Sequence, residues 1–288
     1  MNMIWKYMRE EEFQKAIEIS KSVCVIPMGC LEKHGVHLPV GTDILEASYI
    51  LKKASELEPV CIFPDFVFGD VQGHYNAKGG IVLSVETELQ LLKEICSEIA
   101  RNGFKKILIY NGHGGNQPLI MHFLRSQSYS KKDYVVMYYM MPLVAPYQLM
   151  DMVNKGGREQ FPELTDEDIE VMRDFVMHKK TMGHGCFGET AYILGSYPET
   201  VRMDRLGVES GLSTKATQYL NDAGIHLQDD GWIINYLNRY SGHDPYGCNE
   251  RIGKAAIRVA AEDLAKRLKI IKEDDNILKW NEEFNKSW

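Results

Sequence analysis

Short apolar runs alternate along the chain with segments of helical periodicity. The apolar runs have the length and the β-branched content of buried strands. They cover residues 21–27, 60–64, 105–110 and 134–141. Apolar residues three or four positions apart predict helices. This second pattern covers residues 44–57, 88–102, 118–126, 165–177 and 255–271. Strands that alternate with helices predict an α/β fold whose largely parallel sheet is covered on both faces.

The helix predicted at residues 88–102 has the clearest boundary signals. Thr87 and Gln90 have the pattern of a capping box at its start, and Gly103 is a typical stop. Residues 156–188 form the least regular stretch of the chain. No internal repeat, low-complexity tract or shift in composition marks a boundary between domains. We therefore predict one domain that spans residues 1–288.

Composition and charge narrow the class of protein. Of the 288 residues, 44% are hydrophobic and 25% are charged, as is usual for a soluble globular protein. The 33 basic and 40 acidic residues give a net charge of −7, which argues against binding to nucleic acid or to an anionic membrane. No apolar run approaches the ~20 residues that span a bilayer. The six cysteines form no CxxC pair and the start of the chain does not resemble a secretory signal, so we expect a reduced, cytoplasmic protein.

Histidines gather on loops that follow predicted strands. His34 and His37 follow the first strand, and His113 follows the strand at residues 105–110. In an open parallel sheet, ligands bind outside the carboxyl ends of the strands. Because both loops leave such ends, we expect them to converge.

The first of these loops carries the residue types of a metal site. Glu32, His34 and Asp43 offer mixed oxygen and nitrogen ligands, which suit Zn²⁺, Mn²⁺ or Fe²⁺ better than Ca²⁺. Glycines flank His113 on both sides and allow a tight turn that brings its imidazole close to an ion. Spacing alone predicts a metal site and nothing more specific.

Each of these residues also has a simpler interpretation. Asp43 or Thr42, placed before an apolar periodic run, is typical of a plain helix cap. A lone loop histidine is most often solvated or simply hydrogen-bonded. That interpretation is preferred for His74, His122, His178, His226 and His243. These simpler interpretations, taken together, do not explain why acids and histidines cluster at one edge of the predicted sheet.

Four stretches together resemble the creatininase (creatinine amidohydrolase) family. Residues 26–43 (IPMGCLEKHGVHLPVGTD) and 103–116 (GFKKILIYNGHGGN) match its first two motifs. Residues 184–190 (HGCFGET) and 242–268 resemble its later ones. The resemblance implies a three-layer α/β/α sandwich with a mostly parallel central sheet, a two-metal centre in each chain, and homo-oligomers, commonly hexamers.

The resemblance also implies a role for each residue. Glu32 and His113 would hold one divalent ion, His34 the other, and Asp43 would bridge them. Zn²⁺ is the favoured ion, and Mn²⁺ and Fe²⁺ also accept these ligands.

Two departures separate this chain from creatininase itself. In creatininase, the resemblance implies, a glutamate at the position of Gly115 binds the second ion. This chain lacks that glutamate, and other branches of the family imply that Glu189 replaces it. In addition, none of the four tryptophans lies in residues 141–183, where the resemblance places a substrate-covering lid. Creatinine is therefore a doubtful substrate.

The expected reaction is attack of a metal-activated water on a carbonyl carbon. His184 would move a proton to the leaving group, assisted at the catalytic centre by Glu189. The alternative is that His184 only holds the side chain of Glu189 in position. His37 would orient a ligand or line the pocket. The leading activity is hydrolysis of a C–N amide bond in a small cyclic amide or formamide. The alternatives are ring opening of a cyclic keto-sugar or inosose and a non-catalytic binding protein on the same fold.

Overall fold

A four-stranded parallel sheet forms the centre of the computed structural model, which describes residues 1–71 and 73–287. The strands are β1 (Val23–Met28), β2 (Cys61–Ile62), β3 (Lys106–Asn111) and β4 (Val135–Met140). Their order is β2-β1-β3-β4, and every neighbouring pair is parallel. The predicted α/β fold with a parallel sheet is confirmed.

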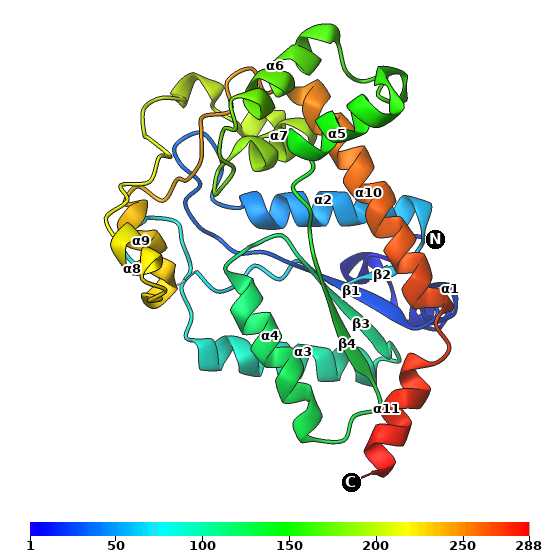
Figure 1. The fold of residues 1–288 in the computed structure, drawn as a ribbon. Coiled ribbons are helices and arrows are strands. Elements are labelled where there is room, and N and C mark those ends of the chain that lie inside the picture. The colour runs from blue at the N-terminus through cyan, green and yellow to red at the C-terminus, as the bar shows by residue number, and fades with distance from the viewer. Residues whose placement is uncertain (72, 288) are drawn as a thin grey trace.

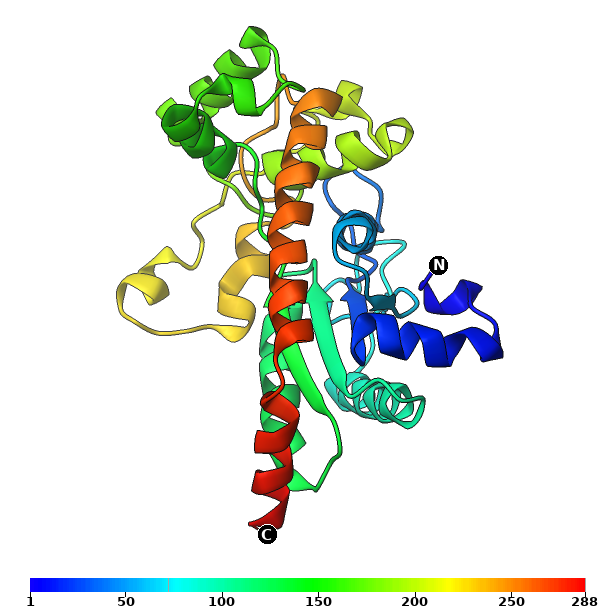
Figure 2. The same ribbon diagram turned by 90° about the vertical axis from the view of Figure 1, so that its right-hand side faces the viewer.

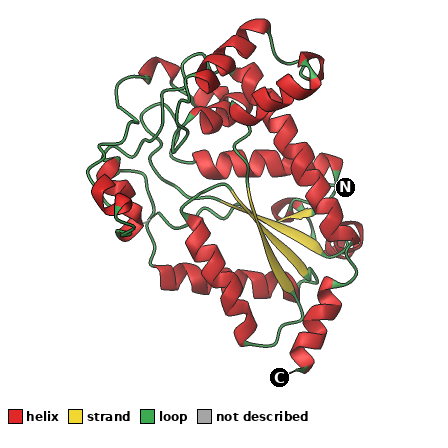
Figure 3. Cartoon of the chain, viewed as in Figure 1, coloured by secondary structure: helices red, strands yellow, loops and turns green. Residues whose placement is uncertain are grey.

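Helices cover both faces of this sheet (Figures 1 and 3). They are α1 (Phe13–Ser20), α2 (Thr42–Leu57), α3 (Val85–Arg101), α4 (Asn116–Ser126), α5 (Tyr147–Gly156), α6 (Asp166–Met177), α7 (Phe187–Ser196), α8 (Gln218–Asp222), α9 (Trp232–Asn235), α10 (Glu250–Glu273) and α11 (Ile277–Lys286). Figure 3 shows that most loops gather on one side of the sheet, the side where β1 and β3 end. No helix within the described residues has the length and hydropathy needed to cross a membrane.

Two apolar layers explain why the strands are apolar throughout. Side chains alternate between the faces of a strand, so β1 sends Val23 and Val25 to one layer and Cys24 and Ile26 to the other. The first layer also contains buried residues of α2, α7 and α10, and the second contains residues of α1, α3 and α4. Because both faces are buried, neither face of β1 needs polar side chains.

The long helix α10 holds α7 in place. Figure 2 shows α10 running along the length of the molecule, with α11 continuing towards the C-terminus. The two helices α7 and α10 approach closely at Gly195 and Gly253: a Cβ added to Gly253 would lie 2.5 Å from the backbone nitrogen of Gly195. Small residues at the crossing let the backbones meet, and this holds α7 against α10.

Two predicted helix boundaries are wrong. Helix α3 begins at Val85, because the hydroxyl of Ser84 accepts a hydrogen bond from the backbone N–H of Thr87 at 3.3 Å; Ser84 is therefore the N-cap. Helix α2 already includes Thr42 and Asp43, and Gly41 precedes its first residue. The Asp43 carboxylate does not cap the helix, since it points to a cluster of histidines described below.

Candidate metal centre

The loops after β1 and β3 converge with the first turns of α2 and α7, as the strand order predicts. They open on a cleft of about 870 Å³. The cleft is lined by Glu32, Asp70, Val71, His74, Val85, Gly112, His113, Gly114, Gly115, Pro118, Leu119, His122, Met140, Met141, Leu143, Gly183, His184, Glu189, Leu227 and Trp232. Four of the acids and imidazoles that the sequence indicated are in this lining, namely Glu32, His113, His184 and Glu189.

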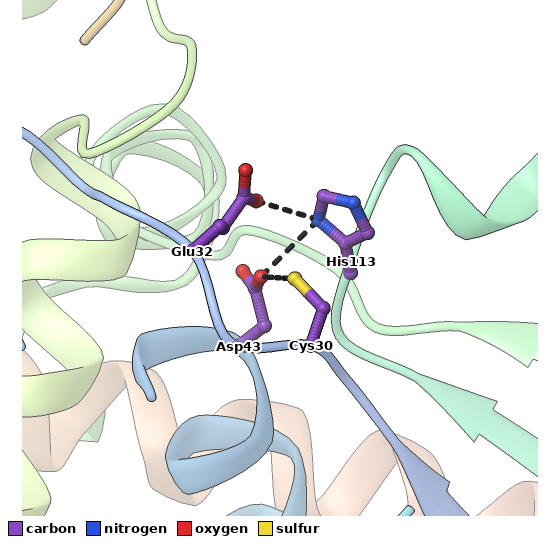
Figure 4. Close-up of side chains that lie close together, drawn as sticks. All are labelled: Cys30, Glu32, Asp43 and His113. Carbon is purple, nitrogen blue, oxygen red and sulfur yellow. Dashed lines mark hydrogen bonds and ion pairs between the residues drawn. The ribbon is translucent and has the colours of Figure 1, made fainter. Parts of the chain in front are cut away.

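One group of ligand-type atoms surrounds His113 (Figure 4). Its Nδ1 lies 3.0 Å from Oε1 of Glu32 and 3.1 Å from Oδ2 of Asp43. The thiol of Cys30 donates to the same Asp43 oxygen at 2.9 Å. All four side chains are buried, and their ligand atoms lie within 4.8 Å of one another. The contact between Glu32 and His113 does not have hydrogen-bond geometry, so Glu32 Oε1 has no hydrogen-bond partner among the described residues.

A second group adjoins the first through Asp43. Nε2 of His34 lies 3.0 Å from Oδ1 of Asp43 and 3.9 Å from Oε2 of Glu189. The ring of His184 lies beside that of His34, with centroids 3.9 Å apart. The structure thus brings together all six residues singled out in the sequence. Asp43 faces His113 with one oxygen and His34 with the other, which is the arrangement that a bridging carboxylate requires.

Three histidines each direct one ring nitrogen at a backbone carbonyl. His113 Nε2 lies 2.9 Å from the carbonyl oxygen of Asp70. His34 Nδ1 lies 3.2 Å from that of Glu32, and His184 Nε2 lies 2.7 Å from that of Lys33. A carbonyl only accepts, so each bond places a proton on that nitrogen, and the other nitrogen faces the carboxylates, where it can carry a second proton or bind an ion. Metal-binding histidines are oriented in this way.

The backbone around the site explains how the two loops approach each other. A Cβ on Gly112 would lie 3.1 Å from Cβ of Ala47 and closer still to the carbonyl oxygen of Asp43, so only glycine fits against the start of α2. Asp43 and Glu189 both lie in the first turn of a helix, where the helix dipole stabilises a carboxylate. The backbone N–H of Gly185 donates to Oε2 of Glu189 at 2.5 Å.

Charge in this buried site shifts the pKa values of its groups. Burial opposes the charged ring of His34, but Asp43 and Glu189 outweigh burial and raise its pKa to about 10. For Asp43, burial is likewise outweighed, by His34 and His113, and its pKa falls. Burial lowers the pKa of His184 to about 4. Burial also raises the pKa of Glu189 to about 7.

Position 115 leaves no room for the glutamate that the family resemblance implies there. A Cβ there would lie 3.0 Å from the carbonyl oxygen of Asp70, 3.1 Å from Cε1 of His113 and closer still to Nε2 of the same ring. The ring of His113 therefore occupies the space that the side chain would need. Glu189, from α7, is the nearby carboxylate instead.

Three residues of the site were not predicted from the sequence. His74 was expected to be an ordinary loop histidine, yet it is buried and its Nε2 lies 2.9 Å from Oε2 of Glu32. Cys30 lies between the recognised Gly29 and Glu32, but its thiol carried no separate signal. Glu46, one turn after Asp43 on α2, has a carboxylate oxygen within 4.8 Å of those of Asp43 and Glu189.

Trp232 lines the cleft beside His74 and His184, and we call these three rings the aromatic wall. The segment expected to form a lid contains no tryptophan. Trp232, on the short helix α9, stacks on His74 with centroids 6.0 Å apart and an interplanar angle of 27°. It meets His184 edge to face at 5.4 Å. The absence of tryptophan from residues 141–183 therefore does not remove aromatic residues from the site.

The fold and site define an α/β protein with a buried carboxylate–imidazole cluster at the carboxyl edge of its sheet. A family model described as creatininase, creatinine amidohydrolase, matches residues 6–268, and the chain belongs to this family. It is 25% identical over 218 residues to the creatinine amidohydrolase of Pseudomonas putida, covering 71% of this chain and 74% of that protein.

Further relatives align over shorter lengths. A 2-amino-5-formylamino-6-ribosylaminopyrimidin-4(3H)-one 5'-monophosphate deformylase of Methanococcus voltae is 38% identical over 99 residues, which are 32% of this chain and 35% of that protein. The mycofactocin precursor peptide peptidase of Mycobacterium tuberculosis is 31% identical over 102 residues, 32% of this chain and 40% of the relative.

Solved structures show the same fold. A mutant creatininase of Zn-Zn type has a TM-score of 0.71 and 18% identity, covering 95% of this chain and 100% of that chain. A manganese creatininase has a TM-score of 0.69 and 19% identity over the same shares.

Proposed function

We propose that this protein is a metal-dependent hydrolase that cleaves a C–N amide bond of a small molecule. The observation that carries this proposal is the orientation of His34, His113 and His184, each with one nitrogen at a backbone carbonyl and the other facing buried carboxylates. Four carboxylates and several imidazoles in a buried space form a donor set that fits divalent cations.

The ligand roles follow from the two groups of atoms. Glu32, His113 and one oxygen of Asp43 would hold one ion, and His34, Glu189 and the other oxygen of Asp43 would hold a second. Zn²⁺ is our favoured ion, with Mn²⁺ and Fe²⁺ as alternatives. When bound, such ions supply hydroxide near neutral pH and polarise the carbonyl group that is attacked.

His184 is our candidate for proton transfer. The hydrogen bond that holds Glu189 comes from Gly185, whereas Nδ1 of His184 faces Glu32 at 3.5 Å. Because burial lowers its pKa to about 4, the His184 ring is neutral at pH 7 and can accept a proton at Nδ1. It would then pass that proton to the leaving nitrogen. Glu189 would assist as an ionised ligand of the second ion, since a carboxyl group that binds a metal ion gives up its proton.

The substrate class rests on the relatives and on the cleft. The relatives include a creatinine amidohydrolase and deformylases, which act on amide C–N bonds. The cleft of about 870 Å³ accommodates a small molecule beside Trp232. We therefore propose a cyclic amide or formamide as substrate. Assembly into homohexamers stays a prediction, which light scattering of the purified protein tests.

Metal analysis and one variant test the proposal. We expect two divalent ions per chain in wild-type protein after metal supplementation, and loss of at least one ion together with activity in His113→Ala. The matched control is His178→Ala, since His178 is exposed and pairs with Asp174 away from the cleft. A panel of cyclic amides, formamides and keto-inositols would identify the substrate. Full metal content and activity in His113→Ala would refute the ligand assignment.

A further inference from the structure

Glu46 is a buried acid without a hydrogen-bond partner. Its residue is 1% exposed, and neither carboxyl oxygen has a hydrogen-bond partner among the residues that the structure describes. An acid in such surroundings needs either a proton or a nearby cation, because burial penalises an isolated charge strongly. Neither the matched family motifs nor the proposed ligand set accounts for this residue.

The position of Glu46 on α2 directs it towards the metal centre. It follows Asp43 by three residues, so both side chains lie on the same face of the helix. Helix α7 faces them and contributes Glu189 from its first turn. One carboxylate oxygen from each of these three acids lies within 4.8 Å of the other two. That span is close to the diameter of a coordination sphere with metal–oxygen bonds of about 2.0–2.2 Å.

The groups around Glu46 do not neutralise it. Asp43 and Glu189 are the nearest acids and repel a negative charge, whereas His113 attracts one. His113 already faces both Glu32 and Asp43. Three converging carboxylates thus share too few positive groups, and a cation between them would compensate all three.

We propose that Glu46 is a protein ligand of the second ion, together with His34, Asp43 and Glu189. This inference rests on the two-metal function proposed above and adds a residue to it. The second position then has three carboxylates and one imidazole. The first has Glu32, Asp43 and His113, with the thiol of Cys30 beside them.

The two positions should consequently differ in the ions they prefer. Oxygen ligands favour Mn²⁺, while imidazole and thiol groups favour Zn²⁺. Loss of Glu46 should therefore weaken Mn²⁺ binding at the second position and leave the first position intact.

The test is a Mn²⁺ titration of metal-stripped protein, followed by the electron paramagnetic resonance signal of free Mn²⁺. We would compare wild type, Glu46→Gln and Glu46→Leu. Glu88→Gln is the matched control. Glu88, like Glu46, is a buried helical acid, and both of its carboxyl oxygens lack a hydrogen-bond partner among the described residues. It lies outside the clustered ligand groups. Circular dichroism would check that each variant is folded, and Glu46→Gln decides the question if Glu46→Leu does not fold.

We expect two Mn²⁺ per chain in wild type and in Glu88→Gln, and at least tenfold weaker binding of one Mn²⁺ in Glu46→Gln. A smaller loss, with two ions still bound by wild type, overturns the role of Glu46 alone. If wild type binds no Mn²⁺ or Zn²⁺, the two-metal function itself fails and the inference fails with it.

Discussion

The adjacent glycines Gly114 and Gly115 offer a matched pair of substitutions next to the metal centre. A Cβ on Gly114 would meet nothing within 4 Å, whereas one on Gly115 would press on the ring of His113 and on the carbonyl of Asp70. Neither glycine has a positive φ, so alanine meets no backbone strain at either position. The two alanine variants therefore differ mainly in the space around the new methyl group.

The expected displacement is large for a buried site. Ordinary contact between heavy atoms needs about 3.5 Å, so the ring of His113 would have to move by roughly 1 Å in Gly115→Ala. This movement would break the 2.9 Å contact between Nε2 of His113 and Asp70. Loss of such an orienting bond typically lowers metal affinity about 10–100-fold. Overpacking would also destabilise the fold by about 1–3 kcal/mol.

The assay is a Zn²⁺ titration against a competing chelator, with thermal unfolding of the metal-free proteins. We expect Gly115→Ala to bind at least one ion 10–100-fold more weakly, and Gly114→Ala to bind as wild type does. Equal affinity in the two variants would refute the idea that the ring of His113 is held by its surroundings. It would also remove the steric reason why this chain lacks a glutamate at position 115.

Two further predictions concern pH and the aromatic wall. A proton on His34 stabilises the metal-free fold fully below pH 6.5, and this contribution is lost as the pH rises through the folded pKa of about 10. Because an ion must displace that proton, affinity for Zn²⁺ should rise about tenfold per pH unit between pH 6 and 8. Calorimetry in several buffers would measure this dependence, and an affinity that does not change with pH would contradict the prediction. Trp232→Ala should raise KM about fivefold, because the substrate loses roughly 1 kcal/mol of stacking on the indole ring. The control Trp280→Ala, at an exposed position, should not change KM. Equal KM values in the two variants would exclude Trp232 from substrate binding.

The sequence predicted the part of the site that follows from sheet topology. Glu32, His34 and His113 lie in loops that leave the carboxyl ends of β1 and β3, and parallel strands bring such ends to one edge. The positions of these residues therefore required only the correct assignment of two apolar runs as strands.

The remainder of the site depends on packing that local patterns do not reveal. Helix α7, which carries Glu189, was not predicted from the sequence, because nine of its ten residues are buried and it has no polar face to give a helical period. His74 lies in a glycine-rich loop without periodicity. Glu46 does lie on the same face of α2 as Asp43, but only the approach of α7 shows that this face is part of the site.

The number of ions can be argued from charge alone, independently of the family resemblance. Glu32, Asp43, Glu46 and Glu189 are each at most 8% exposed, and together they would carry four negative charges if all were ionised. Buried charges must be compensated, and the pKa of His34, raised to about 10, shows that a proton on its ring compensates one of them. Two divalent cations balance four carboxylates, whereas one leaves two negative charges that protons on His34 or on the acids themselves would have to neutralise. The buried acids of this protein thus favour two bound ions over one.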